Sequence, residues 1–145
     1  MLTKDTEELK KELIATDNIN NFLSDNSANF RCYTFTEYFN LLLREKSLLR
    51  RQVIKASSLG TYAYHILAGT KKSTSRKNIL SIAFAMGLSP KETDYLLYYA
   101  GHKKLYPRSK WDSVVFYALY KHKNIEETNK LLANCNLTPL LGDVD

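Results

Sequence analysis

The sequence predicts an all-α protein. Apolar residues recur at helical spacing through most of residues 34–141, and four segments in that range begin with a helix-capping pattern. In each, a Ser, Thr or Asn is followed three residues later by Asp or Glu. The pairs are Thr34 with Glu37, Ser89 with Glu92, Ser109 with Asp112, and Asn124 with Glu127. Residues 76–106 also match residues 111–141 at an offset of 35, which indicates two copies of one helical hairpin.

The first 33 residues are predicted to form one short helix and a linker. Residues 5–16 have Leu and Ile at helical spacing and begin with a capping pattern. Residues 17–31 are rich in Asn, Asp and Ser, which favours an ordered loop or a linker over a further element. The main domain is therefore expected to begin at Thr34.

After a helix that ends near residue 46, two short helices are predicted at residues 49–56 and 61–67. The turn between them, residues 57–60, contains the small residues and the Gly that a sharp reversal needs. Helices this short are stable only when packed, so each must bury one face. This geometry is a helix-turn-helix, in which the second helix lies in the DNA major groove and the first crosses the backbone.

The side chains of this motif divide into an inward and an outward set. Ala63, Ile66 and Leu67 are spaced to pack inward. The side chains left to read base edges are Thr61, Tyr62, Tyr64 and His65. Those expected to contact phosphate are Arg50, Arg51, Gln52, Lys55, Lys71, Lys72, Ser73, Arg76 and Lys77. The loop over residues 70–76 also fits a capping loop with Ser75 as the N-cap of the next helix, and the two interpretations are compatible.

Helices at residues 76–86 and 90–100 complete the main domain, residues 34–106. Residues 107–145 form a C-terminal hairpin with helices at 109–122 and 124–134. The matches at the offset of 35 include Ala83 with Ala118, Thr93 with Thr128, Leu97 with Leu132, and Leu105 with Leu140. We expect the second hairpin to pack on the first. The period also suggests a tetratricopeptide solenoid, but such arrays usually need three or more repeats.

Positive charge is concentrated in one part of the chain. The net charge of +6 arises almost entirely from residues 36–77, which have nine basic and two acidic residues. Residues 1–35 sum to −2 and residues 78–145 to +1. A segment of this kind suits phosphate binding, because neutralised phosphates release counterions. The alternative is a solvated basic face without a ligand.

The composition is that of one compact domain with short appendages. Its 145 residues, 44% of them hydrophobic, are enough to bury a core. No signal peptide and no 18-residue apolar stretch is present, so we expect a cytoplasmic protein without a membrane association. Cys32 and Cys135 lack the spacing of a metal site or a disulfide framework, and we expect two buried free thiols.

The region over residues 35–141 resembles the lambda-repressor-like, Xre-type helix-turn-helix proteins, with an added C-terminal helical hairpin. The matching segments are RQVIKAS, TYAYHILAG, AFAMGLSPKETDYLLYYAG, LYPRSKWD and ETNKLL. The resemblance implies a five-helix bundle that binds DNA, preceded by the N-terminal helix and followed by the hairpin. It also places Arg50 where many such proteins have a Gln that touches DNA.

These features favour sequence-specific binding of double-stranded DNA by a bacterial or phage transcriptional regulator. A homodimer is expected, because one short recognition helix reads few bases and most such folds bind paired half-sites. The rival hypothesis is a helical protein-interaction module with a degenerate helix-turn-helix. An enzyme is not supported, since the three His are scattered and neither a Gly-rich phosphate loop nor a carboxylate pair is evident. No cofactor and no metal is expected.

Overall fold

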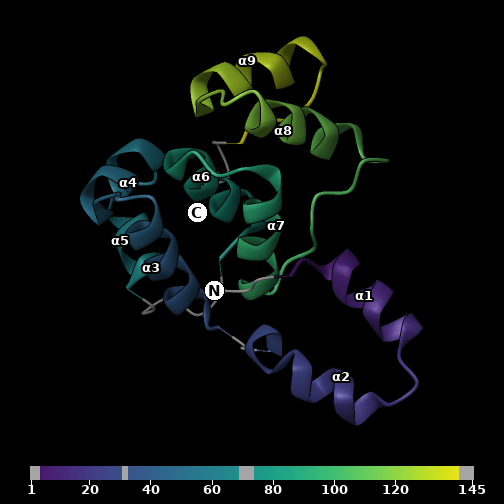
Figure 1. The fold of residues 1–145 in the computed structure, drawn as a ribbon. Coiled ribbons are helices and arrows are strands. Elements are labelled where there is room, and N and C mark those ends of the chain that lie inside the picture. Colours follow the sequence, from purple (N-terminus) through teal and green to yellow (C-terminus); the bar gives the residue numbers. More distant parts are fainter. Residues whose placement is uncertain (1–3, 31–32, 69–73, 141–145) are drawn as a thin grey trace. The chain divides into compact units, whose positions relative to one another are not determined.

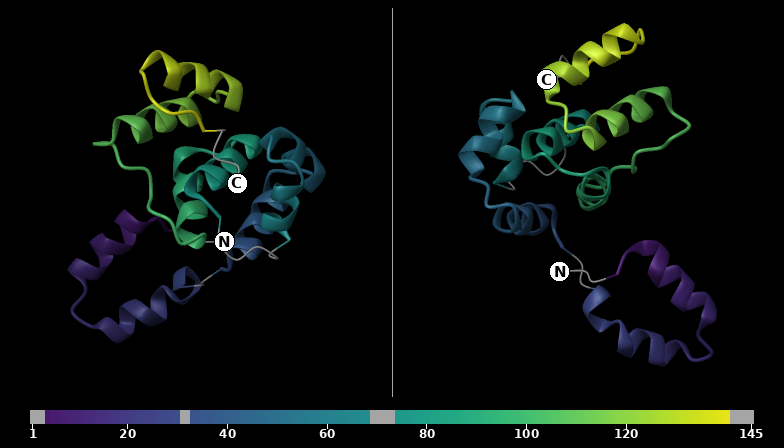
Figure 2. Two further views of the ribbon diagram at one scale, coloured as in Figure 1. Left: turned by 180° about the vertical axis from the view of Figure 1, so that it is seen from behind. Right: turned by 45° about the horizontal axis from the view of Figure 1, so that its top comes forward.

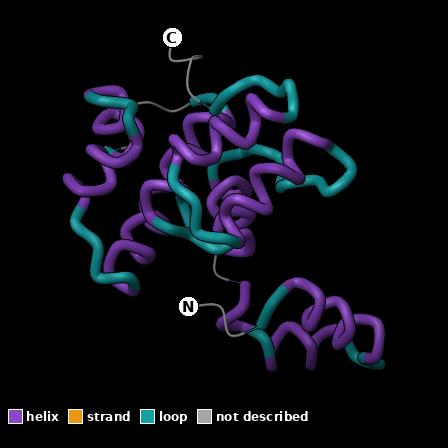
Figure 3. The backbone as a smooth tube through the Cα atoms, turned by 90° about the horizontal axis from the view of Figure 1, so that it is seen from above, coloured by secondary structure: helices purple, strands orange, loops and turns teal. Residues whose placement is uncertain are grey.

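The computed structural model describes residues 4–30, 33–68 and 74–140, and all regular structure within these ranges is helical (Figures 1 and 3). The predicted all-α class is therefore confirmed for the part of the chain that the structure describes. None of these described helices is long and apolar enough to cross a bilayer. The chain divides into two compact units, residues 1–33 and residues 34–145, and each is described by itself below.

Unit 1, residues 1–33, is more structured than its sequence suggests. Its described elements are α1 (Thr6–Ala15), α2 (Ile19–Asp25) and the 3-10 helix η1 (Ser27–Phe30). The prediction of a loop or linker over residues 17–31 is therefore wrong for α2, because residues that indicated a loop act as caps and buried polar groups. Asn18 caps α2 by accepting from amides of its first turn. Asn26 is 1% exposed and donates to Glu12 Oε2 and to Phe22 O, each at 3.0 Å.

Unit 2, residues 34–145, follows the predicted order of helices closely. Its described helices are α3 (Phe35–Glu45), α4 (Arg50–Ser57), α5 (Thr61–Leu67), α6 (Arg76–Met86), α7 (Pro90–Tyr99), α8 (Lys110–Tyr120) and α9 (Ile125–Asn134). Complete capping boxes open α3, α7 and α9, and Ser109 caps α8 by accepting from Asp112 N. The helix starts could be predicted because each depends on contacts within one turn.

Helix α6 is the centre of unit 2. It packs against α4, α7 and α9, while α3 packs on α7, α5 on α4, and α8 on both α7 and α9. Figures 1 and 2 show α6 and α7 between the group α3–α5 and the pair α8–α9. Eight residues of α6 are buried, including the polar Asn78 and Ser81. Because α6 is buried over most of its circumference, it forms the core on which the other helices of this unit pack.

The sequence repeat corresponds to two hairpins, α6–α7 and α8–α9, which close in the same way. Asp94 Oδ1 accepts from Leu105 N at 2.9 Å, and Asn129 Oδ1, 35 residues on, accepts from Leu140 N at 2.8 Å. Leu105 and Leu140 are both buried, with 8% and 1% exposure. In each hairpin, an Asp or Asn side chain of the second helix therefore holds the segment that follows that helix by accepting from its backbone amide.

Candidate nucleic-acid interface

The helices α4 and α5 lie in a part of the chain that has no acidic residue. No Asp or Glu occurs between Glu45 and Glu92, whereas residues 46–91 contain nine Lys and Arg. Arg51 and Lys55 are exposed on α4, as is Arg50 at its start. No carboxylate of this segment therefore neutralises the positive charge of the two helices, and an anionic partner is favoured.

The turn between α4 and α5 is held by buried side chains and by two residues with positive φ. Ser57 Oγ donates to Ile54 O at 2.7 Å and accepts from Leu59 N at 3.3 Å. Ser57 and Leu59 are buried, with 0% and 5% exposure. Ser58 has φ of 60° and Gly60 has φ of 62° with ψ of −140°. Because these contacts are internal to the turn, they fix how α5 is presented relative to α4.

Gly60→Ala is expected to destabilise unit 2 by about 1–3 kcal/mol. The combination of φ 62° and ψ −140° is accessible essentially to Gly alone. A Cβ built at Gly60 has no atom within 4 Å, so the cost lies in the backbone and not in a clash. Urea denaturation measures the change, with Ser58→Gly as the control, since that substitution relieves a positive φ and should not lower stability. Equal unfolding midpoints for wild type and Gly60→Ala would contradict the turn geometry.

Helix α5 has one buried and one exposed face, as predicted for its inward set. Ala63, Ile66 and Leu67 have 0%, 2% and 0% exposure. On the opposite face Thr61, Tyr64 and His65 are exposed, and Tyr64 reaches 55%. The Tyr64 and His65 rings meet edge to face with centroids 5.8 Å apart. The structure therefore brings Thr61, Tyr64 and His65 together on the outer surface.

Tyr62 differs from the other predicted base-reading residues. Its side chain is half-buried, and its hydroxyl oxygen accepts from Thr74 Oγ1 at 3.5 Å. Thr74 Oγ1 in turn accepts from Asn78 Nδ2 at 3.0 Å, and the Thr74 carbonyl oxygen lies 2.8 Å from His102 Nε2. These contacts give Tyr62 a role in anchoring the chain before α6. Sequence reasoning missed the cluster because it joins α5 to residues far along the chain.

The N-terminus of α4 is basic. Arg50 and Arg51 are its first residues, and no acidic residue lies in the first turn, although this end of a helix favours negative charge. Leu49 at the N-cap offers no side-chain acceptor to the amides there. Arg50 Nη2 donates to Asn40 Oδ1 of α3 at 2.8 Å, a contact between helices that no local sequence pattern indicates. Uncapped amides with two Arg residues form an environment that suits phosphate.

The remaining predicted phosphate residues on α4 are Gln52 and Lys55. Gln52 turns back along α4, where its Oε1 accepts from Leu49 N at 3.4 Å, while Lys55 is exposed on the same helix. Lys71, Lys72 and Ser73 lie outside the described residues. Ser75 caps α6 by accepting from Asn78 N, which agrees with the capping interpretation of this loop.

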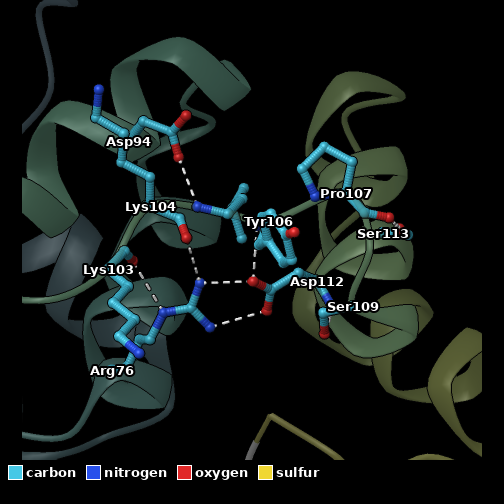
Figure 4. A network of polar contacts seen from close by, with 10 residues as sticks. Arg76, Asp94, Lys103, Lys104, Tyr106, Pro107, Ser109, Asp112 and Ser113 are labelled. Atoms are coloured by element: carbon cyan, nitrogen blue, oxygen red, sulfur yellow. Dashed lines mark hydrogen bonds and ion pairs between the residues drawn. The ribbon is translucent and has the colours of Figure 1, made fainter.

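Arg76 and Lys77 are directed at the C-terminal hairpin, which conflicts with their prediction as phosphate contacts. Arg76 forms a bidentate pair with Asp112, with Nη1–Oδ1 at 2.9 Å and Nη2–Oδ2 at 2.8 Å (Figure 4). Its Nε and Nη2 also donate to Lys103 O and Lys104 O, each at 3.0 Å. Lys77 Nζ lies 5.7 Å from the centre of the Trp111 ring. Local charge indicated a ligand, but the tertiary structure supplies an internal partner.

The carboxylate that pairs with Arg76 is held in its ionised form. Burial of Asp112 favours the neutral acid, but hydrogen bonds from Arg76 and from Tyr106 N at 2.8 Å outweigh burial and lower the pKa. The Asp112 side chain is 8% exposed and that of Arg76 is 25% exposed. Asp112 N in turn donates to Ser109 Oγ at 3.2 Å. The pair therefore joins the start of α6 to the start of α8.

Helices α4 and α5 form a pair of short helices that contains basic residues and no Asp or Glu, within an all-helical unit. Its outward residues are Thr61, Tyr64 and His65, with Arg50, Arg51 and Lys55 on the neighbouring helix. Cys135 is exposed, so the expectation of a buried thiol is wrong for this residue, because it follows the last turn of α9; Cys32 lies outside the described residues. No protein-family model, curated protein or solved structure matches this chain.

Proposed function

We propose that α4, the turn at residues 58–60 and α5 form a helix-turn-helix that binds double-stranded DNA. Helix α5 enters the major groove, and α4 crosses the phosphate backbone. The observation that carries the proposal is the division of α5: Ala63, Ile66 and Leu67 are buried, while Thr61, Tyr64 and His65 are exposed beside a basic helix. Hydroxyl and imidazole groups are suited to hydrogen bonding with base edges.

Phosphate is bound at the N-terminal end of α4 and along its exposed side. Arg50, Arg51 and Lys55 supply the positive charge, and the first-turn amides supply donors that no side chain at Leu49 occupies. Asn40 orients the Arg50 guanidinium. A seven-residue recognition helix reaches few base pairs, so specificity requires two half-sites. The protein accordingly acts as a homodimer, and its role is transcriptional regulation.

Arg51→Ala and Lys55→Ala are each expected to weaken binding to all duplexes alike, because phosphate contacts are independent of sequence. Each should also lower the slope of log Kd against log salt by about one. The measurement is fluorescence anisotropy with duplexes at several salt concentrations, after selection from a random pool. Lys10→Ala is the matched control, since Lys10 is an exposed lysine of α1 in unit 1 that pairs with Glu7.

Several outcomes of this experiment would count against the proposal. Slopes unchanged by both α4 substitutions would place DNA elsewhere or exclude it. A slope that changes equally with Lys10→Ala would indicate diffuse attraction to the net positive charge. If the protein bound DNA but selection produced no consensus sequence, it would bind phosphate without reading bases.

A further inference from the structure

Helix α8 exposes a row of aromatic side chains outside the proposed DNA interface. Phe116, Tyr117 and Tyr120 are 43%, 50% and 64% exposed. Their spacing puts them on one side of the helix, while Val115, Ala118 and Leu119 on the other side are buried. We refer to Phe116, Tyr117 and Tyr120 as the aromatic row. Large aromatic groups grouped on one helical face are typical of interaction sites.

The internal repeat shows that a helix face of this kind is covered in the first hairpin. The residues 35 positions before Phe116, Tyr117 and Tyr120 are Ser81, Ile82 and Ala85 of α6. Ser81 and Ile82 are 0% exposed, and Ala85 is half-buried. Helices α4, α7 and α9 all pack on α6, whereas α8 packs on α7 and α9. Among the described residues of unit 2, nothing covers the aromatic row of the second hairpin. The repeated hairpin therefore presents in its second copy a face that helices cover in its first.

The surroundings of the row are basic. Arg108 and Lys110 precede it, and Lys121 follows it with Nζ 6.0 Å from the Tyr117 ring centre and 5.8 Å from that of Tyr120. The only carboxylate in residues 106–123 is Asp112, which is buried and paired with Arg76. A partner with negative charge therefore complements this edge of α8.

The acidic residues at the start of α9 are already engaged within that helix. Glu127 Oε1 accepts from Asn124 N at 3.0 Å as part of a capping box, and Glu126 pairs with Lys130 at 3.6 Å. These carboxylates serve the helix start and a lysine of the same helix. They leave the positive charge around the aromatic row to be matched by a partner.

We propose that the aromatic row binds an amphipathic helix of another protein, whose apolar side is flanked by Asp and Glu. Anchors at positions i, i+1 and i+4 of a helix form a ridge that fits between the side chains of a second helix. Tyr and Phe supply large rigid contact areas. A second copy of α8 fits poorly, because antiparallel pairing would bring Lys121 toward Lys110, and parallel pairing would bring Lys121 toward its own equivalent.

Two synthetic helical peptides with the same stripe of Leu, flanked by Glu in one and by Lys in the other, test this proposal with the full chain. The Glu peptide is expected to bind about tenfold or more tightly than the Lys peptide. Tyr117→Ser with Tyr120→Ser should weaken that binding about tenfold or more. Lys110→Glu with Lys121→Glu should invert the preference between the peptides. Tyr98→Ser is the matched control, since Tyr98 is 64% exposed on α7.

Other outcomes overturn the proposal. Equal affinity for both peptides, binding of neither, or binding that Tyr98→Ser weakens as much as the double substitution would exclude an acidic helix at this row. A smaller native mass of the Tyr117→Ser, Tyr120→Ser variant would show that a second copy covers the row instead. Loss of oligo(dT) binding in that variant would assign the row to single-stranded nucleic acid. DNA binding through α4 and α5 is measured in parallel and should be unchanged, so the two proposals fail separately.

Discussion

Asp112→Ala is expected to destabilise unit 2 by about 2–4 kcal/mol, because it leaves the Arg76 guanidinium without its carboxylate. Loss of one partner from a fully buried pair costs about 3–5 kcal/mol, and the estimate here is lower because a quarter of the Arg76 side chain is exposed. The substitution also removes the acceptor of Tyr106 N at 2.8 Å. Equilibrium denaturation in urea measures the change.

The matched control is Lys46→Ala, which breaks the ion pair between Lys46 and Glu92 at 3.1 Å. The Glu92 side chain is 28% exposed, whereas that of Asp112 is 8% exposed, so loss of the Lys46–Glu92 pair should cost less, about 1 kcal/mol. Arg76→Ala alone, and Arg76→Ala combined with Asp112→Ala, complete a double-mutant cycle that isolates the coupling of the two side chains. If Asp112→Ala lowered the free energy of unfolding no more than Lys46→Ala does, the Arg76–Asp112 pair would not stabilise the packing of the hairpin α8–α9.

The same pair predicts how stability depends on pH. The pKa of Asp112 is lowered in the folded protein by Arg76 and Tyr106 N, against the opposing effect of burial. A carboxyl group with a depressed pKa contributes stability that is present above its unfolded pKa, near 3.9, and lost as the pH falls through the folded value. Asp112→Asn should therefore flatten the loss of stability below about pH 4 relative to wild type.

The features that sequence could predict are those decided within one or two helical turns. Thr34 with Glu37 and Ser89 with Glu92 form capping boxes as expected, because both members of each pair are close in the chain. The inward face of α5 follows from the spacing of apolar residues alone. The repeat at an offset of 35 predicted two hairpins, because it depends on matching residues and not on their contacts.

The errors occur where a contact joins distant segments. Arg76 and Lys77 belong to a basic run in the sequence, but their partners Asp112 and Trp111 lie in the next hairpin. Charge along the chain gives the sign of an expected partner and does not reveal whether the protein itself supplies it. The contact of the Tyr62 hydroxyl with Thr74 is likewise one that its position on α5 does not indicate.

Thr61→Ala and His65→Ala are each expected to weaken binding to the selected DNA site by about 1–3 kcal/mol, because each removes a polar group placed to reach base edges. Both residues are exposed on the face of α5 opposite Ala63, Ile66 and Leu67. Binding to scrambled duplexes and the thermal midpoint should stay close to wild type, since neither side chain belongs to the core. Tyr64→Ala extends the set, because Tyr64 is 55% exposed and contacts the His65 ring.

The design separates base reading from phosphate binding and from a purely structural role. Lys55→Ala should reduce the affinity for selected and scrambled duplexes by the same factor, whereas Thr61→Ala and His65→Ala should reduce the ratio between them. Tyr62→Phe removes the hydroxyl beside Thr74 and is expected to act mainly through stability. If Thr61→Ala and His65→Ala bound both duplexes with wild-type affinity, α5 would not read bases. A protein-interaction module would then explain the exposed face of α5 better than DNA recognition does.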